Sequence, residues 1–323
     1  MAAGGVVGIP TETVYGLAAD ARNEAAVHSI FEAKGRPQDN PLILHIPDAS
    51  WLARYCKDVP ETAYRLAGRF WPGPLTMILP KADCVPLVTT GGLETVGMRC
   101  PDHAVTRAII AAAGVPVAAP SANTSGRPSC TTAAHVREDM DGRIDGVVDG
   151  GPCRVGVEST IIDLTCQPPR LLRPGGLPLE ELERVLGTVL VDKCITQLMT
   201  DGERPRAPGM KYRHYAPDAE VVVAEGRERE IAAKICREYD AREAAGEDCI
   251  IFATKQTQPF YRGRNCVIIG DRTEPATLCA SLFYSLREYG DRADVIFAEA
   301  LPNDDMGLAY MNRLLRSAGF NII

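Results

Sequence analysis

The sequence has no long apolar run. Nowhere do its residues approach the roughly 18 uncharged apolar positions from which a membrane-spanning helix is built. The first ten residues, MAAGGVVGIP, lack the basic segment and the long apolar stretch of a signal peptide. These absences argue against a membrane or secreted protein, and we expect a protein that stays in the cytoplasm.

Cysteines are present, but they form no pattern. The 11 cysteines are an odd number, and no CxxC pair occurs among them. Zinc sites and disulfide frameworks use close, regular spacings. We therefore expect no metal site of this kind, and we interpret the cysteines as reduced, buried thiols of a cytoplasmic protein.

Several familiar catalytic motifs are also absent. There is no GxxxxGK[ST] phosphate loop, no kinase glycine loop, no GxSxG elbow and no HExxH. The net charge of -7, with a pI near 5.4, argues against extended binding to a nucleic-acid backbone, although it is compatible with a local basic cleft. The 46% of hydrophobic residues indicates a globular protein, and the length of 323 residues indicates two domains.

In the first half of the chain, apolar runs alternate with amphipathic stretches. Strands are predicted at 6–9, 42–46, 75–79, 96–99, 115–119, 146–148, 160–164 and 170–172, and helices at 24–34, 61–69, 103–113, 132–140 and 179–186. Asn23 caps the first of these helices and Gly35 ends it. This alternation predicts an α/β or α+β domain with a mixed sheet over residues 1–187.

The alternation stops between residues 188 and 217. Proline, glycine and charged residues dominate 201–217, so we interpret 188–217 as an extended linker. Beyond it, strands are predicted at 220–224, 249–253, 266–269 and 295–298, with helices at 227–239, 276–288 and 307–317. These elements predict a small Rossmann-like domain over 218–323. It contains no GxGxxG, so dinucleotide binding there has no support.

Polar residues gather in loops after predicted strands, where the sites of α/β domains usually lie. PTETVYG at 10–16 offers threonine hydroxyls to a ligand, or simply a hydroxyl-stabilised turn. KGRPQDN at 34–40 places two cations at a helix end, where they suit either phosphate oxygens or the helix dipole. PSANTSGRPS at 120–129 suits a nucleotide in front of a helix, or forms a polar turn.

Weaker candidates follow other strands. Arg99 ends one strand, VEST at 157–160 enters another and LRPGG at 172–176 leaves a third. The segment KYRHYAP at 211–217 is basic and aromatic, which is unusual for a spacer. We expect it to act as a lid, with a histidine or aromatic ring closing over a bound base.

Taken in order, these segments resemble one family. PTETVYGLAADARN, KGRPQDNPLILHI, FWPGPLTMIL, GMRCPDH, APSANTSGRPS, GVESTIID and LLRPGG resemble the YrdC-like family, and APGMKYRHYAPDAEVVV and MGLAYMNRLL resemble its long, two-domain form. The resemblance implies a twisted open mixed sheet with helices around a basic cleft, plus a small Rossmann-like domain. The family's first strand and helix have no counterpart ahead of the initial GGVV segment, but no matched site residue is lost.

The resemblance also implies an activity, that of a nucleotidyltransferase. L-threonine, bicarbonate and ATP would give L-threonylcarbamoyladenylate and pyrophosphate, for the threonylcarbamoyladenosine modification of tRNAs that read codons starting with A. It implies catalytic cations at Lys34 and Arg36. The residues that match the family's threonine contacts are Thr13, His45, Arg99, Ala119 and Ser159. The residues that match its ATP contacts are Arg36, Asn40, Thr95, Ser121, Asn123, Ser129, Arg173 and His214.

The implied chemistry brings several anions together, and fixed cations suit that task. Mg²⁺ would accompany ATP through water and phosphate oxygens, so no carboxylate cage is needed. His45 either assists the threonine amine or only binds it. The implied partner is a tRNA threonylcarbamoyl transferase complex that receives the product, with no membrane and little or no direct nucleic-acid binding.

Two other functions are compatible with parts of the sequence. A double-stranded RNA-binding module would use the basic cleft, but the acidic pI weighs against it. A carbamoyltransferase subdomain would come with an acylphosphatase-like module and zinc-finger cysteine pairs, which this sequence lacks.

Overall fold

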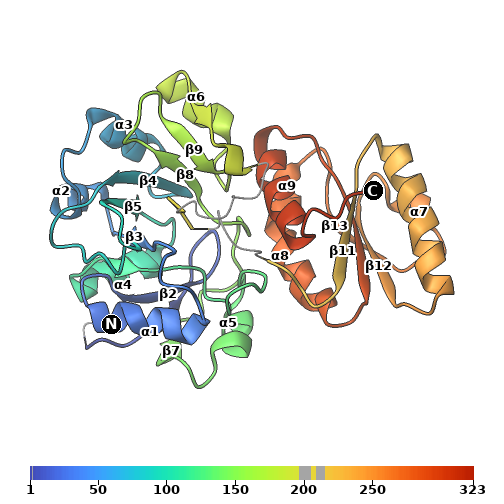
Figure 1. The fold of residues 1–323 in the computed structure, drawn as a ribbon, viewed down its shortest axis with the longest axis horizontal. Helices are drawn as coiled ribbons and strands as arrows, with labels where there is room; N and C mark the ends of the chain where they lie inside the picture. The colour runs from blue at the N-terminus through green and yellow to red at the C-terminus, as the bar shows by residue number, and fades with distance from the viewer. Residues whose placement is uncertain (2, 196–204, 209–214) are drawn as a thin grey trace. The chain divides into compact units, whose positions relative to one another are not determined.

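The computed structural model describes residues 1, 3–195, 205–208 and 215–323. The chain divides into two compact units (Figure 1). The first comprises Met1–Ser125 and Ser129–Tyr212, and the second comprises Gly126–Pro128 and Arg213–Ile323. Each is described below by itself.

The first unit is built on a mixed sheet. Ten of its described strands form this sheet in the order β10-β9-β8-β4-β5-β3-β6-β2-β1-β7. They are β1 (Val7–Ile9), β2 (Gly16–Asp20), β3 (Ile43–His45), β4 (Leu75–Pro80), β5 (Thr95–Arg99), β6 (Val117–Ala118), β7 (Gly146–Val147), β8 (Thr160–Asp163), β9 (Arg170–Arg173) and β10 (Leu190–Val191). The sheet contains parallel pairs, such as β3 with β5, and antiparallel pairs, such as β4 with β5. The expected open mixed sheet is confirmed.

Helices connect these strands. They are α1 (Glu24–Lys34), α2 (Leu52–Tyr55), α3 (Glu61–Phe70), α4 (Ala104–Ala113), α5 (Ala133–Met140) and α6 (Leu179–Leu186). The end signals predicted for α1 are present, because the Asn23 side chain accepts a hydrogen bond from the Ala26 amide and Gly35 is left-handed at φ 59°. Thr132 caps α5 in the same way.

The segment interpreted as a linker begins inside this unit. β10 pairs in parallel with β9, and Cys194 and Ala207 are buried in an apolar cluster with Ile78 and Leu172. Arg206 donates to the Asp192 carboxylate at 2.7 Å. The described parts of 188–208 therefore add to the core of the first unit. Residues 196–204 and 209–214, which include most of the proposed lid at 211–217, lie outside the described residues.

The second unit is a small parallel sheet. Its strands β11 (Glu220–Ala224), β12 (Cys249–Thr254), β13 (Cys266–Gly270) and β14 (Val295–Glu299) lie in the order β11-β14-β12-β13, and each described pair is parallel. α7 (Glu228–Ala244) packs against β11, β12 and β14, whereas α8 (Pro275–Gly290) and α9 (Asp305–Ser317) pack together on the opposite face (Figure 1). This arrangement confirms the expected Rossmann-like fold.

One apolar cluster of the second unit lies between the sheet and α7. Val222, Ile235, Ile251 and Phe297 are among its buried side chains. None of the helices in the described part of the chain combines the length and apolar character that crossing a membrane requires.

Candidate functional site

A row of polar side chains crosses the middle of the ten-stranded sheet. Thr76 on β4 pairs with Arg99 on β5, and Arg99 pairs with His45 on β3. Residues opposite each other on neighbouring strands project to the same face. Ser159, which directly precedes β8, joins the row through a 2.8 Å hydrogen bond between its hydroxyl and that of Thr76. The register thus brings together three predicted threonine contacts.

The loop between β1 and β2 adds the fourth predicted side chain to this row. Arg99 Nη2 donates to Thr13 Oγ1 at 2.9 Å. The Thr11 hydroxyl lies 2.8 Å from the Thr13 hydroxyl and donates to the Val14 carbonyl at 2.6 Å, which closes the loop into a turn. All of these side chains except Val14 are polar, and all are buried. The turn and the polar row are therefore parts of one structure.

Glu12 belongs to the site, although the sequence analysis did not include it. Its carboxylate Oε1 lies 2.8 Å from Arg99 Nη2, and both side chains are almost completely buried. Apart from this ion pair, neither Glu12 oxygen has a hydrogen-bond partner within the described residues. A buried carboxylate is costly unless it is paired. One signal was available in the sequence: an acid between two threonines, directly after an apolar strand.

His45 is buried beside Arg99. Burial, followed by the nearby Arg99 charge, lowers the pKa of His45 to about 3. Its Nδ1 lies 3.3 Å from the Ile43 carbonyl oxygen, which can only accept, so Nδ1 carries the hydrogen and Nε2 keeps its lone pair. His45 is therefore a neutral acceptor near pH 7. Ala119, which directly follows β6, donates its amide to the same Ile43 carbonyl at 3.1 Å.

The residues predicted for ATP binding and catalysis include a group around Lys34. Its ammonium group, at the buried end of α1, donates to the backbone carbonyls of Ser121 and Asn123, the second at 2.5 Å. The Ser125 amide donates back to the Lys34 carbonyl at 2.9 Å. The Lys34 side chain thus holds the 121–125 loop against the end of α1.

Arg36 and Asn40 lie in the loop after α1. Arg36 Nη2 approaches the carbonyls of Asn40 at 3.4 Å and Pro41 at 3.3 Å. Asn40 is 2% exposed, and its Oδ1 has no hydrogen-bond partner among the described residues. Thr95 begins β5 opposite Pro80 and is half-buried.

Arg173 joins the two sets. Its Nε and Nη2 donate to the Ser159 carbonyl at 3.1 and 2.9 Å, and Nη2 also reaches the Ser159 hydroxyl at 3.2 Å. Its Nη1 donates to the Pro208 carbonyl at 3.3 Å. The neighbouring Glu158 accepts from the Ser129 hydroxyl at 2.7 Å. A predicted ATP contact is thus bonded directly to a predicted threonine contact.

The structure does not place every predicted residue. His214 lies outside the described residues. Among the residues that are described, no cluster of three or more histidine, cysteine or acidic side chains could hold a metal ion.

The structure is that of a two-unit α/β protein whose first unit carries a buried row of cations and hydroxyls across a mixed sheet. Two family models match the chain: "Telomere recombination" over residues 1–175 and "Threonylcarbamoyl-AMP synthase, C-terminal domain" over residues 177–319. The chain belongs to the threonylcarbamoyl-AMP synthase family.

Individual relatives agree over the full length. The threonylcarbamoyl-AMP synthase of Pyrococcus abyssi is 48% identical over 99% of this chain and 92% of its own. That of Bacillus subtilis is 47% identical over 98% of this chain and 90% of its own. The crystal structure of P. abyssi Sua5 complexed with L-threonine has a TM-score of 0.94 at 47% identity, covering 100% of this chain and 93% of that one.

Proposed function

We propose that the chain catalyses the conversion of L-threonine, bicarbonate and ATP to L-threonylcarbamoyladenylate, pyrophosphate and water. The observation that carries this proposal is the buried row of Thr13, His45, Arg99 and Ser159, on a fold that matches a relative crystallised with L-threonine. The product would serve threonylcarbamoyladenosine modification of tRNA and would pass to a transferase complex. The absence of close cysteine pairs supports the cytoplasm as the place of action.

In this proposal the polar row binds threonine. Arg99 receives the carboxylate, because its guanidinium is buried and its Nε has no hydrogen-bond partner among the described residues. The hydroxyls of Thr13 and Ser159 and the Ala119 backbone complete the set. Neutral His45 offers Nε2 as an acceptor to the threonine amine. A pKa of about 3 makes it a weak base, so it orients the amine and does not hold its proton.

Glu12 has a place in the same scheme. Its carboxylate balances the Arg99 charge, so the guanidinium remains in one position before substrate arrives. Its second oxygen, Oε2, has no hydrogen-bond partner in the described structure and is suited to an ammonium group. Free threonine carries an ammonium group and a carboxylate. Glu12 would face the ammonium group, and Arg99 would face the carboxylate.

The ATP side uses the loops at 34–40 and 121–129 with Arg173. Arg36 and Arg173 would face the phosphates, and Asn40, with its buried and unpartnered Oδ1, would meet a donor on the nucleotide. The proposed ATP contacts are completed by Thr95, Ser121, Asn123, Ser129 and His214. Lys34 is proposed as a catalytic cation beside Arg36, and its ammonium also holds the 121–125 loop. Little covalent work falls to the protein, and catalysis is mainly orientation and charge stabilisation.

Mg²⁺ is proposed to accompany ATP. Bound to phosphate oxygens, it would neutralise charge as pyrophosphate departs. In this proposal the ion arrives with the nucleotide and is held largely by its oxygens.

The proposal is tested by measuring pyrophosphate release with each substrate omitted in turn. Release that requires ATP, threonine and bicarbonate together supports it, with the adenylate identified by mass spectrometry. Equal release without threonine would overturn it. Release that requires threonine but not bicarbonate would indicate amino-acid activation of the ordinary kind instead.

A further inference from the structure

The second unit contains a cavity of its own. It has a volume of about 540 Å³ and is lined by residues 226–230, Arg272 and Pro302, all of them in this unit. A space of this size falls within the range that holds small-molecule ligands. None of these residues takes part in the site of the first unit.

The cavity lies where the topology of the sheet favours a ligand. β11 and β14 are neighbours and parallel, and the residues that follow their carboxyl ends, 226–230 and Pro302, form its walls. From β11 the chain passes to α7 on one face, and from β14 it passes to α9 on the other (Figure 1). In open α/β sheets, ligands bind outside the carboxyl ends of the strands at this kind of switch point.

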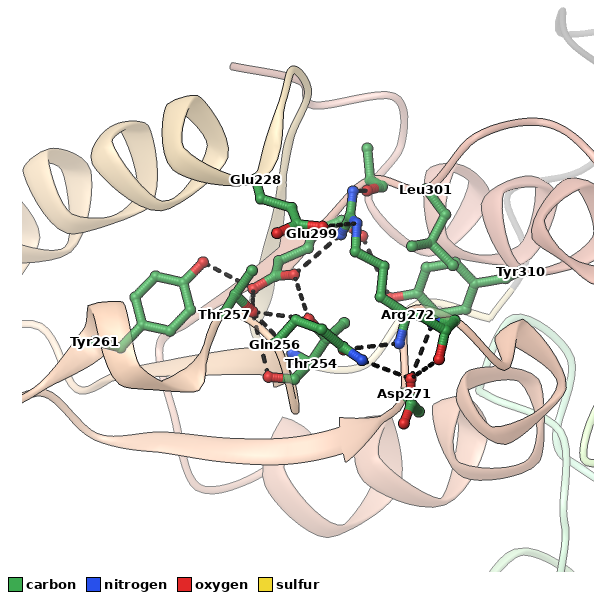
Figure 2. Close-up of polar contacts among 12 residues, drawn as sticks. Glu228, Thr254, Gln256, Thr257, Tyr261, Asp271, Arg272, Glu299, Leu301 and Tyr310 are labelled. Carbon is green, nitrogen blue, oxygen red and sulfur yellow. Dashed lines mark hydrogen bonds and ion pairs between the residues drawn. The ribbon is translucent and has the colours of Figure 1, made fainter.

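One side of the cavity is formed by Arg272, whose side chain is held in place by hydrogen bonds. Glu299, buried at the end of β14, accepts hydrogen bonds from the hydroxyls of Thr254, Thr257 and Tyr261, and Arg272 Nη1 donates to it at 3.2 Å (Figure 2). Arg272 Nη2 donates to the Ala300 carbonyl at 2.6 Å. These two bonds use two of the five N–H groups of the guanidinium. Arg272 is thus rigidly held and still has donors for a ligand.

Two more arginines line the cavity, and both lie at the N-terminus of a helix, where a positive charge is unfavourable. Arg227 caps the N-terminus of α7, and Arg229 lies in its first turn. Neither guanidinium forms an ion pair within the described residues, and both side chains are exposed. The N-terminus of a helix is the positive end of its dipole, where cations are unfavourable and anions favourable. The two guanidinium charges therefore do not stabilise α7.

Two acidic residues also line the cavity, and both have other partners. Glu228 Oε1 lies 3.7 Å from Arg272 Nε, and Glu230 Oε2 accepts from the Arg227 amide at 2.9 Å. Glu299 lies behind Arg272 and is not part of the cavity lining. Arg272 is balanced by Glu228 and Glu299. The positive charge that remains for a ligand comes from Arg227, Arg229 and the helix dipole.

We propose that this cavity binds the phosphate or pyrophosphate group of a small anionic molecule. Arg272 would form a fork with two phosphate oxygens, Arg227 and Arg229 would close over the group, and the first amides of α7 would point at it. The group would be free or would be carried by a mononucleotide, since no dinucleotide fingerprint is present.

The test uses the full chain without threonine or bicarbonate. Amide hydrogen exchange is measured with inorganic phosphate, pyrophosphate or AMP, and affinities are measured by calorimetry. Exchange localises the ligand, because protection of residues 226–231 is separate from any protection in the first unit. Protection by phosphate or pyrophosphate indicates a free anion as occupant, and protection by AMP alone indicates a nucleotide.

The variant is the double substitution R227S/R229S. Serine is a favourable N-cap residue, so we expect the second unit of this variant to stay folded. A loss of binding would then not result from unfolding. The matched control is R237S/R262S, which removes the same charge from exposed positions outside the cavity. We expect the first variant to abolish protection at 226–231 and weaken binding at this site by about tenfold or more, with no change in the control. The proposal fails if no probe protects 226–231, or if both variants lose protection equally.

Discussion

Arg99 and Glu12 form a buried ion pair, with 2.8 Å between Nη2 and Oε1, in the middle of the polar row. The strand register fixes Arg99, and the turn after β1 brings Glu12 to it. Each charge is acceptable at this depth only because the other is present. The pair therefore contributes both to the stability of the first unit and to the position of the Arg99 guanidinium in the site.

A double-mutant cycle tests this connection. We expect Glu12→Ala and Arg99→Ala each to lower the free energy of unfolding by about 3 kcal/mol, because each leaves a buried charge without its partner. The double variant should lose clearly less than the sum. Both tryptophans, Trp51 and Trp71, lie in the first unit, so fluorescence during urea unfolding reports on that unit alone.

The control cycle uses Lys57 and Asp83, which are 2.6 Å apart with side chains 51% and 88% exposed. An exposed pair contributes at most about 1 kcal/mol. Equal coupling energies in the two cycles would contradict the interpretation of Glu12 and Arg99.

Arg36→Ala should separate activity from stability. Arg36 is half-exposed after the end of α1, so its loss should cost folding about 1 kcal/mol or less. If it contacts phosphate oxygens in the transition state, activity per folded molecule should fall about a hundredfold or more. Pyrophosphate release and tryptophan-monitored unfolding provide the two measurements. Arg22→Ala, which removes an exposed arginine paired with Asp20, is the control and should leave release unchanged.

Local signals were sufficient for most of the fold. Asn23 and Gly35 predict both ends of α1 because capping depends on neighbouring residues alone. β2 was missed because its first four residues are all buried, so the alternation that marks a half-buried strand is absent. β10 was missed because it is two residues long and stands in a segment without apolar periodicity. α2 is a single turn with no side-chain cap.

The site was predictable as a set of residues and not as a set of contacts. The sequence left Lys34 as a cation either for phosphate oxygens or for the helix dipole, and the structure adds that its ammonium holds two backbone carbonyls. Nothing local to Lys34 reveals this, because the carbonyls come from the 121–125 loop. Glu12 was missed for the same reason, since its partner is Arg99 on β5.

Burial of His45 should make the first unit sensitive to acid. The folded chain keeps His45 neutral down to about pH 3, whereas an unfolded histidine is protonated near pH 6.5. Between these values the unfolded state binds more protons, so stability is full above pH 6.5 and falls as the pH falls. The loss from His45 should be about 2 kcal/mol at pH 5.

The measurement is tryptophan-monitored unfolding at pH 7 and pH 5. The free energy of unfolding at pH 7 minus that at pH 5 should be about 2 kcal/mol smaller in His45→Asn than in the unchanged chain. This holds whether or not the substitution also lowers the stability at pH 7. Ser29→Asn, which removes no titratable group from a half-buried position of α1, is the control and should leave the difference unchanged. An unaltered pH difference in His45→Asn would show that another group causes the acid sensitivity.

The boundary of the first unit is tested by comparing chains that end at residue 187 and at residue 208. The longer chain keeps β10 and the buried side chains of Cys194, Ile195 and Ala207, which cover apolar residues of the sheet. We expect the free energy of unfolding of the shorter chain to be about 3 kcal/mol lower, because removing these groups exposes an apolar face of the sheet to water.

Ala207→Asp in the longer chain provides an independent check of the same contact. Ala207 is fully buried in the cluster with Ile43, Ile78, Ile161 and Leu172, so a carboxylate there is desolvated among apolar side chains. We expect this variant to lose at least as much stability as the truncation does. Equal unfolding midpoints for the two truncated chains, with a tolerated Ala207→Asp, would place the end of the first unit at residue 187 and return the described part of 188–208 to the linker.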